Sequence, residues 1–343
     1  MAVFLCEEIS VQIYYFQLSL SPWSRLIAKK TPLPFLKIGS TIKRISRILI
    51  KAALIFAEKR RYCEGKGMLA MDIITILKAI ILGMVEGLTE FAPVSSTGHM
   101  IIVDDMWLKS QEFLGKYAAN TFKVVIQLGS ILAVVVVFKE RFIDLLGLRG
   151  RHRDGQPRLK LMQVIVGLIP AGVLGVLFED YIDEHLFSTA TVLIGLVLGA
   201  LLMIAADVFA KKAPKAQTVD QITYKQAFIV GLIQCLSLWP GFSRSGSTIS
   251  GGVLAGMSHR AAADFTFIMA VPIMLGASVL SLLKNWQYFT MDALPFFIAG
   301  FISAFVFALV SIRFFLRLIN QIRLVPFAVY RIVLALVIYV LYF

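Results

Sequence analysis

Two glutamates lie four residues apart in an otherwise apolar helical run, and this spacing suggests that they share a cation or a proton. On a helix, Glu86 and Glu90 share one face about one turn apart, so their carboxylates repel each other unless a cation or a shared proton intervenes. Hard carboxylate oxygens favour Mg²⁺ or Ca²⁺, and with only two protein carboxylates the phosphate oxygens of a substrate would complete the coordination. The alternative is a solvated helix face. The apolar neighbours disfavour it, because ionisable groups at membrane depth are rare and usually functional.

A polar turn follows the glutamates along the chain. It contains Ser95, Ser96, Thr97 and Gly98, and His99 comes directly after it. The hydroxyls and the backbone N–H groups of such a turn can bind an anion. A neutral imidazole can act as a general acid or base, or as a nucleophile toward phosphorus. The alternative for the histidine is a structural residue with satisfied hydrogen bonds.

A second polar segment carries the complementary charge at Arg244. Its guanidinium offers a planar fork of donors suited to two phosphate oxygens, and it keeps its proton when buried. Further donors surround it in Ser243, Ser245, Ser247 and Thr248. A structural salt bridge to one of the two glutamates is the alternative role. Together, these groups indicate metal-assisted cleavage of a phosphate ester or anhydride whose apolar part lies in lipid, such as a lipid diphosphate.

The two polar segments are copies of one motif at a constant offset of 148 residues. The matched pairs are Gly83 and Gly231, Glu86 and Gln234, Leu88 and Leu236, Thr89 and Ser237, Phe91 and Trp239, Ser95 and Ser243, and Gly98 and Gly246. In each copy a helical run ends at a proline, crosses a turn of serine and glycine, and re-enters an apolar stretch. This pattern is typical of a re-entrant helix-loop-helix hairpin.

The composition predicts the setting of these hairpins. Of the 343 residues, 58% are hydrophobic and 16% are charged, which excludes an ordinary soluble domain and favours a polytopic helical membrane protein. We expect six transmembrane helices, near 121–139, 160–179, 189–209, 262–284, 293–314 and 325–343. The net charge of +13 fits basic cytoplasmic loops, so we expect no nucleic-acid partner.

The loops between the expected spans alternate in charge. Residues 139–160, 211–225 and 313–323 are basic, whereas 179–185 is acidic, which places the basic loops in the cytoplasm. The two hairpins then enter the membrane from opposite sides and meet near its middle. The predicted fold is therefore all-α, with six transmembrane helices and two re-entrant hairpins in an inverted-topology repeat. The two repeats span about 71–209 and about 221–343.

Residues 1–70 do not fit this arrangement. They hold twelve Lys or Arg against four Asp or Glu, although the loop charges place the start of the first span outside the cell. We predict that this stretch is a basic N-terminal extension, either a product of a mis-assigned start codon or disordered, and that 71–343 is a single membrane-embedded domain. An amphipathic helix around 38–56 on anionic lipid is the alternative.

Both motifs resemble those of a known family. The segments EGLTEFAPVSSTGH at 86–99 and PGFSRSGSTISGG at 240–252 closely resemble the undecaprenyl-diphosphate phosphatases of bacteria, also called bacitracin resistance proteins. The resemblance extends over 71–343 and includes VVIQLGSILAVV around Gln127 and the tail VPFAVYR at 325–331. It implies a multi-pass hydrolase of the bacterial plasma (inner) membrane that converts undecaprenyl diphosphate to undecaprenyl phosphate and inorganic phosphate. Such an enzyme recycles the lipid carrier of peptidoglycan synthesis and gives bacitracin resistance.

The resemblance also implies roles for individual residues. Glu86, Glu90, Ser96, His99 and Arg244 are expected to be catalytic, with the two glutamates either holding a divalent cation, Mg²⁺ or Ca²⁺, or relaying protons. The expected phosphate-binding residues are Ser95, Thr97, Gly98, Gln127, Ser243, Ser245 and Thr248. Ser96, His99 and an activated water remain alternative nucleophiles. The cavity is expected to open to the outer, periplasmic face.

Two other classes of protein remain as alternatives. A lipid-phosphate transporter or flippase could use the same inverted-repeat cavity, although the density of reactive groups favours an enzyme. A non-catalytic bacitracin-binding scaffold would have no need of Arg244. The spacing of Gly195 and Gly199 suits a close helix contact, either within one chain or in a homodimer.

Overall fold

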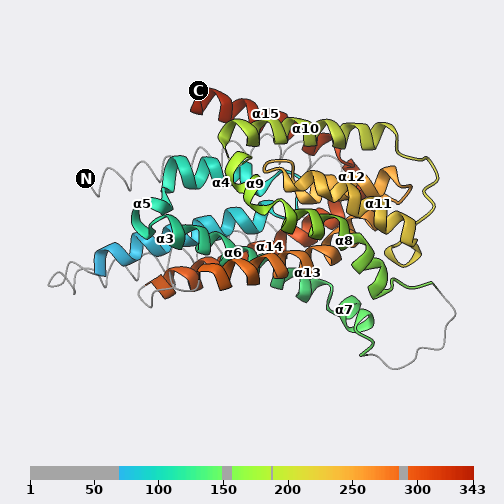
Figure 1. The fold of residues 1–343 in the computed structure, drawn as a ribbon, viewed down its shortest axis with the longest axis horizontal. Helices are drawn as coiled ribbons and strands as arrows, with labels where there is room; N and C mark the ends of the chain where they lie inside the picture. Colours follow the sequence, from blue (N-terminus) through green and yellow to red (C-terminus); the bar gives the residue numbers. More distant parts are fainter. Residues whose placement is uncertain (1–68, 149–156, 187, 286–292) are drawn as a thin grey trace, which may run out of the picture. The chain divides into compact units, whose positions relative to one another are not determined.

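The computed structural model describes residues 69–148, 157–186, 188–285 and 293–343, and these residues are almost entirely helical (Figure 1). The α-helices are α3 (Leu69–Thr89), α4 (Ser96–Met100), α5 (Ser110–Leu114), α6 (Lys116–Val137), α7 (Lys139–Leu145), α8 (Leu161–Leu177), α9 (Glu179–His185), α10 (Thr189–Val208), α11 (Tyr224–Gln234), α12 (Arg244–Leu254), α13 (His259–Asn285), α14 (Leu294–Ile322) and α15 (Val325–Tyr342). A π-helix (Ile101–Leu108) and two 3₁₀ turns (Val219–Gln221 and Cys235–Leu238) complete them. No strand forms in these ranges, in agreement with the predicted all-α class. The prediction for residues 1–70 falls, up to residue 68, outside the described residues.

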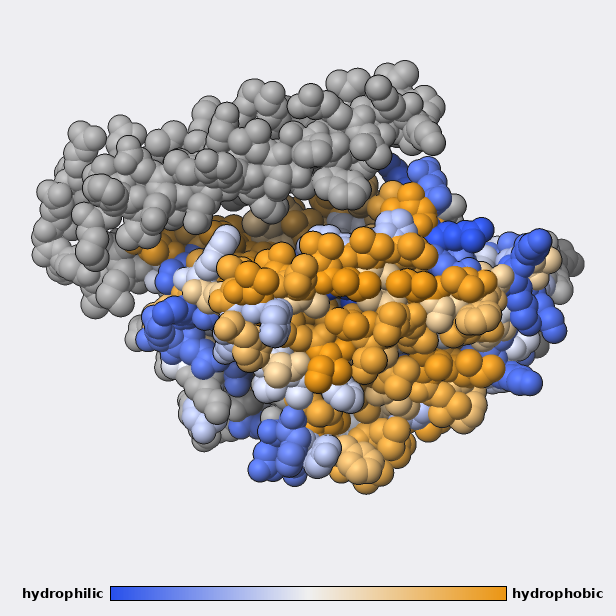
Figure 2. Space-filling view, turned by 90° about the horizontal axis from the view of Figure 1, so that it is seen from above, coloured by the Kyte–Doolittle hydropathy of each residue, from blue (hydrophilic) through white to orange (hydrophobic). Residues whose placement is uncertain are grey.

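Among the described residues, five helices are long and apolar enough to cross a membrane: α6, α10, α13, α14 and α15. They match five of the six predicted spans. The sixth predicted span, at 160–179, forms α8, which has 17 residues and is shorter than the other five. Figure 2 shows a broad apolar surface with hydrophilic side chains on either side of it, as expected for a protein with a lipid-facing belt. The described chain is therefore a polytopic membrane protein.

The helices of the two halves of the chain pack against each other. In the first half, α3 lies on α14 of the second half, where Ser303 and Ser311 donate hydrogen bonds to the carbonyls of Ile80 and Leu88 at 2.7 and 2.8 Å. In the second half, α11 lies on α8 of the first, and the two backbones approach closely at Gly231. The helices α10 and α15 also lie side by side (Figure 1). Neither half forms the core alone.

Polar contacts connect the ends of several helices, and these ends border the basic loops. Arg141 Nη1 contacts both carboxylate oxygens of Asp220, at 2.8 and 2.7 Å, and so joins α7 to the turn before α11. At the end of α10, Asp207 lies 2.6 Å from His259 Nε2 and accepts the backbone N–H of Leu324 at 2.8 Å. Asp207 therefore joins α10 both to the first residue of α13 and to the start of α15.

Close helix contacts within the chain explain the small residues of α10. A Cβ at Gly195 would meet the carbonyl of Pro240, and one at Gly199 would lie 2.5 Å from the carbonyl of Phe242. These two glycines therefore let the 240–242 segment lie against the helix. Of the two uses predicted for this spacing, the structure shows the contact within one chain.

Gly87 of α3 likewise lies at a close contact between two helices. A Cβ there would lie 2.5 Å from the carbonyl of Ala304 and 2.8 Å from the nitrogen of Ala308, both on the backbone of α14. We expect Gly87→Ala to lower the free energy of unfolding by about 1–3 kcal/mol, because neither backbone atom can move aside easily. Thermal unfolding in detergent measures this effect.

Gly172→Ala is the matched control. It also adds a Cβ to a helical glycine, but nothing lies within 4 Å of the new atom. Equal melting temperatures for the two variants would contradict the close packing of α3 on α14.

Candidate active site

The two sequence copies fold into the same turn. Ser95 precedes α4 and Ser243 precedes α12, and each has φ 70°. Each side chain accepts a hydrogen bond from the backbone N–H three residues later, at Gly98 (3.5 Å) and at Gly246 (3.2 Å). A positive φ is costly for a serine, so its recurrence at the same place indicates that both helices need this entry angle.

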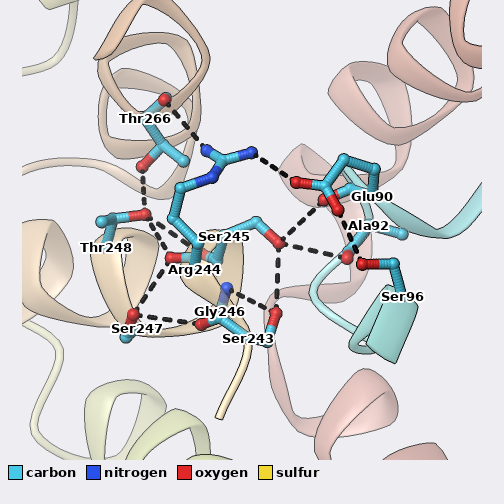
Figure 3. Close-up of polar contacts among 10 residues, drawn as sticks. All are labelled: Glu90, Ala92, Ser96, Ser243, Arg244, Ser245, Gly246, Ser247, Thr248 and Thr266. Carbon is cyan, nitrogen blue, oxygen red and sulfur yellow. Dashed lines mark hydrogen bonds and ion pairs between the residues drawn. The ribbon is translucent and has the colours of Figure 1, made fainter. Parts of the chain in front are cut away.

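The tips of the two turns meet and exchange polar contacts (Figure 3). Ser96 donates a hydrogen bond to Glu90 Oε2 at 2.6 Å, and Arg244 Nη2 lies 3.1 Å from Glu90 Oε1. On the other side, Ser245 donates a hydrogen bond to the carbonyl of Ala92 at 3.1 Å. One carboxylate therefore joins a hydroxyl of its own hairpin to a guanidinium of the other.

The guanidinium of Arg244 is held from several directions. Its Nη1 lies 3.5 Å from the carbonyl of Thr266, and its carbon lies 5.8 Å from the centre of the Phe91 ring. The side chains of Arg244 and Glu90 are 13% and 10% exposed, so this ion pair is largely shielded from solvent. The Coulomb attraction between two opposite charges is stronger in such a setting than on the surface, because less water screens it.

A cavity of about 250 Å³ lies beside this ion pair. Seven predicted site residues line it: Glu90, Ser95, Ser96, Thr97, Gln127, Ser243 and Arg244. It also touches Met274 and Ala277 of α13 and Ala171 of α8. Gln127 lies about halfway along α6 and Met274 about halfway along α13, so the cavity sits near the middle of two candidate spans.

The other predicted site residues lie outside the lining. Glu86 is buried, and its Oε1 has no hydrogen-bond partner among the described residues. Gly98 packs close to Leu196 and Leu334, while Ser245 bridges the hairpins. Thr248 donates a hydrogen bond to the carbonyl of Arg244 at 2.7 Å, so it supports the turn from behind.

His99 also lies outside the cavity lining, and both of its ring nitrogens are engaged. Nδ1 lies 2.7 Å from the carbonyl of Ser95, and Nε2 lies 2.7 Å from the hydroxyl of Tyr330, whose ring stacks on the imidazole. A carbonyl can only accept, so Nδ1 carries a proton, and in the neutral imidazole the tyrosine hydroxyl donates to Nε2. This geometry favours the structural alternative for His99 over the catalytic one.

The chain matches known proteins over most of its length. A sequence profile described as bacitracin resistance protein BacA matches residues 79–337. The chain belongs to the BacA family. It is 94% identical to an undecaprenyl-diphosphatase of Geobacillus sp. (strain WCH70) over 273 residues, which cover 80% of this chain and all of that protein. It is also 64% identical to an undecaprenyl-diphosphatase of Bacillus subtilis (strain 168) over 270 residues, covering 78% of this chain and 98% of that protein. The resemblance noted from the two motifs is thus confirmed.

The BacA-family site includes residues to which sequence reasoning gave no role. Arg331, with no exposed surface, donates from Nη2 to the carbonyls of Gly241 and Phe242 at 2.9 Å each, and so fixes the second turn. Tyr330, its neighbour, contacts the first turn through His99. Both lie in the tail motif, and the available signal was an arginine within an apolar span.

Glu86 and Glu90 are the carboxylates of this BacA-family chain that could hold a metal ion at the site. Among the described residues, no group of three or more His, Cys, Asp or Glu side chains lies together. Glu90 already uses both oxygens in contacts with Ser96 and Arg244, whereas Glu86 keeps one buried oxygen without a partner. That oxygen suits a hard cation whose other ligands come from substrate and water.

The ion pair between the hairpins predicts a thermodynamic coupling. We expect Glu90→Gln and Arg244→Gln each to lower the free energy of unfolding by about 1–3 kcal/mol, between the values for exposed and fully buried pairs, because each leaves one charge unpaired. The double variant should lose less than the sum of the two. Unfolding by SDS in mixed micelles measures all three.

Glu112→Gln provides the control. Glu112 lies 3.1 Å from Lys109, the same distance as in the inner pair, but the two side chains are 70% and 51% exposed. This variant should change stability little. Additive losses in the inner double variant would show that Glu90 and Arg244 do not interact.

Proposed function

We propose that this chain hydrolyses undecaprenyl diphosphate to undecaprenyl phosphate and inorganic phosphate. The name undecaprenyl-diphosphatase, which its relatives carry, supports the substrate. The observation that carries the chemistry is the contact of Ser96 with Glu90 at 2.6 Å, beside Arg244 in a cavity near the middle of the spans. The reaction would return the lipid carrier to peptidoglycan synthesis. It would also give the bacitracin resistance that the family description names.

Ser96 is the nucleophile in this proposal. Its Oγ attacks the terminal phosphorus and its proton passes to Glu90 Oε2, to which it already donates. The bond from the terminal phosphorus to the bridging oxygen breaks, and undecaprenyl phosphate leaves. A water then attacks the phosphorus of the phosphoserine. As the bond from Ser96 Oγ to phosphorus breaks, Glu90 returns to Oγ the proton that it took in the first step and accepts one from the water, which it then passes to the departing inorganic phosphate. His99 positions the turn that carries Ser96.

Arg244 binds the diphosphate. Its Nη2 lies 3.1 Å from Glu90 Oε1, so the guanidinium is already oriented at the cavity. A phosphate entering the cavity competes with Glu90 for this guanidinium, and two phosphate oxygens match its fork better than one carboxylate oxygen does. Loss of this contact leaves Glu90 free to accept the proton.

A divalent cation, Mg²⁺ or Ca²⁺, is part of the proposal. Glu86 would hold it through the buried oxygen that lacks a partner, with Glu90 nearby. When bound, it would neutralise the charge that develops on the phosphate oxygens.

We further infer the finer topology: six spanning helices and two re-entrant hairpins, related as an inverted repeat. The similar Ser95 and Ser243 turns support the repeat, and so does the exchange in which α3 packs on α14 while α11 packs on α8. The first residue of α13, His259, lies among the helix ends that border the basic loops. The cavity touches the other half of α13, at Met274 and Ala277. With those loops in the cytoplasm, the cavity opens toward the outer face of the plasma membrane.

Phosphate release tests the reaction. We expect purified full-length protein in detergent to release inorganic phosphate from undecaprenyl diphosphate, and Ser96→Ala to lower kcat by about 10³-fold or more, because the nucleophile is lost. His99→Gln should retain much more activity than Ser96→Ala and should mainly lower the melting temperature.

The comparison separates the proposed nucleophiles. If His99→Gln were as inactive as Ser96→Ala while still folded, the histidine would regain the chemical role. If well-folded parent protein with metal and lipid released no phosphate, the transporter alternative would be favoured, and measurement of lipid flux would follow.

Metal removal tests the role of Glu86. A chelator should abolish phosphate release, and added Mg²⁺ or Ca²⁺ should restore it. Glu86→Gln should raise the cation concentration needed for half-maximal activity by about 10-fold or more, since a neutral amide is a weaker ligand than a carboxylate. An unchanged cation requirement in this variant would remove Glu86 from the metal site.

A further inference from the structure

Gln234 is a buried amide whose polar atoms face no partner among the residues that the structure describes. It is the last residue of α11, is 1% exposed and lines the cavity beside Arg244. Neither Nε2 nor Oε1 has a hydrogen-bond partner among the described residues. Because both atoms are unpaired, this holds whichever way the amide is turned.

Two other buried glutamines show what is usual in this fold. Gln226, two turns earlier in α11, accepts from the N–H of Thr223 at 3.0 Å and donates to the carbonyl of Ala255 at 3.3 Å. Gln163 in α8 likewise accepts from a backbone N–H and donates to a carbonyl. Buried amides are almost always satisfied in this way, so the partner of Gln234 must come from the cavity that it lines.

The charge of the second hairpin indicates what that partner is. At the constant offset of 148 residues, Gln234 stands where the first hairpin has Glu86, and Leu238 stands where it has Glu90. The second hairpin thus carries neutral residues in place of both acids, and it carries Arg244 where the first has Ser96. This side of the cavity is built to receive an anion and not to hold a cation.

We propose that Gln234 donates a hydrogen bond from Nε2 to a phosphate oxygen of the lipid diphosphate and acts with Arg244 as a two-residue clamp. The inference rests on the proposed function for the identity of the substrate. The amide supplies a neutral donor where a second cation would compete with Arg244 for Glu90. Its oxygen accepts from a water in the cavity.

Binding without turnover tests the clamp. The full chain carrying Ser96→Ala, purified in detergent with Mg²⁺, is titrated with undecaprenyl diphosphate, alone and combined with Gln234→Met or Gln234→Glu. We expect Gln234→Met to raise Kd by about 10-fold or more, as for a lost hydrogen bond to a charged group. Gln234→Glu should raise it further, because a carboxylate repels the phosphate. In the active protein, both variants should raise KM.

Two substitutions on α11 serve as controls. Gln226→Met removes the same atoms from an amide that the protein itself satisfies, so it should lower the melting temperature and leave Kd unchanged. Leu232→Ala alters an exposed apolar residue and should leave both unchanged.

Each outcome decides the proposal separately from the reaction. An unchanged Kd in Gln234→Met overturns the clamp. A Kd that is kept or lowered in Gln234→Glu also overturns it, because the amide oxygen would then be a metal ligand and not a partner of phosphate. If the protein binds the lipid with the expected pattern but releases no phosphate, the clamp stands and the hydrolase proposal fails. If the Ser96→Ala protein does not bind the lipid, the clamp fails.

Discussion

A helix that breaks among apolar surroundings must satisfy the backbone groups that the break exposes, and the rest of the site depends on how this chain does so. Ser95 and Ser243 each cap the helix that follows the break. Arg331 donates to two carbonyls of the second turn, and Ser245 donates to a carbonyl of the first. Arg331 has no carboxylate among its partners in the described residues, which are three carbonyls and the sulfur of Met203, and burying a charge in this way is expensive. The positions of Ser96 and Arg244 follow from the shape of the two turns.

The second feature is the separation of charge between two similar hairpins. The backbone of each turn is nearly the same, but the first hairpin keeps the carboxylates and the second keeps the guanidinium. Two identical hairpins would bring four acids or two cations together, and either set would repel. The divergence of the copies gives an ion pair that holds the tips together when the cavity is empty. In the proposed reaction, it also presents opposite charges to a substrate that carries phosphate.

The sequence predicted much of this because its strongest signals are local. Apolar runs set the spans, and the repeated serine and glycine pattern set the turns, so Ser96, Glu90 and Arg244 could be expected to lie together. What it missed depends on contacts between distant segments. The role of Tyr330 requires knowing that α15 lies beside the first turn, and that of Arg331 requires the loop at Gly241 to lie against α10. His99 looked catalytic because of its neighbours in the chain, but its side chain points to α15. The predicted span at 160–179 is longer than the helix that forms there, because α8 has 17 residues.

The missed residues also explain why the motif alone could not assign roles. A polar residue in a membrane helix can contact the substrate, or it can form hydrogen bonds with other groups of the protein. Both uses favour the same residue types. Only the partners of each atom tell the two apart. His99, Ser245 and Thr248 have their polar atoms engaged within the protein, so they hold the turns. Gln234 has neither amide atom engaged among the described residues, and Glu86 keeps one oxygen unpartnered there. Gln234 lines the cavity and Glu86 is buried outside its lining; in the proposed reaction, the substrate and its cation would supply the partners that these two residues lack among the described residues.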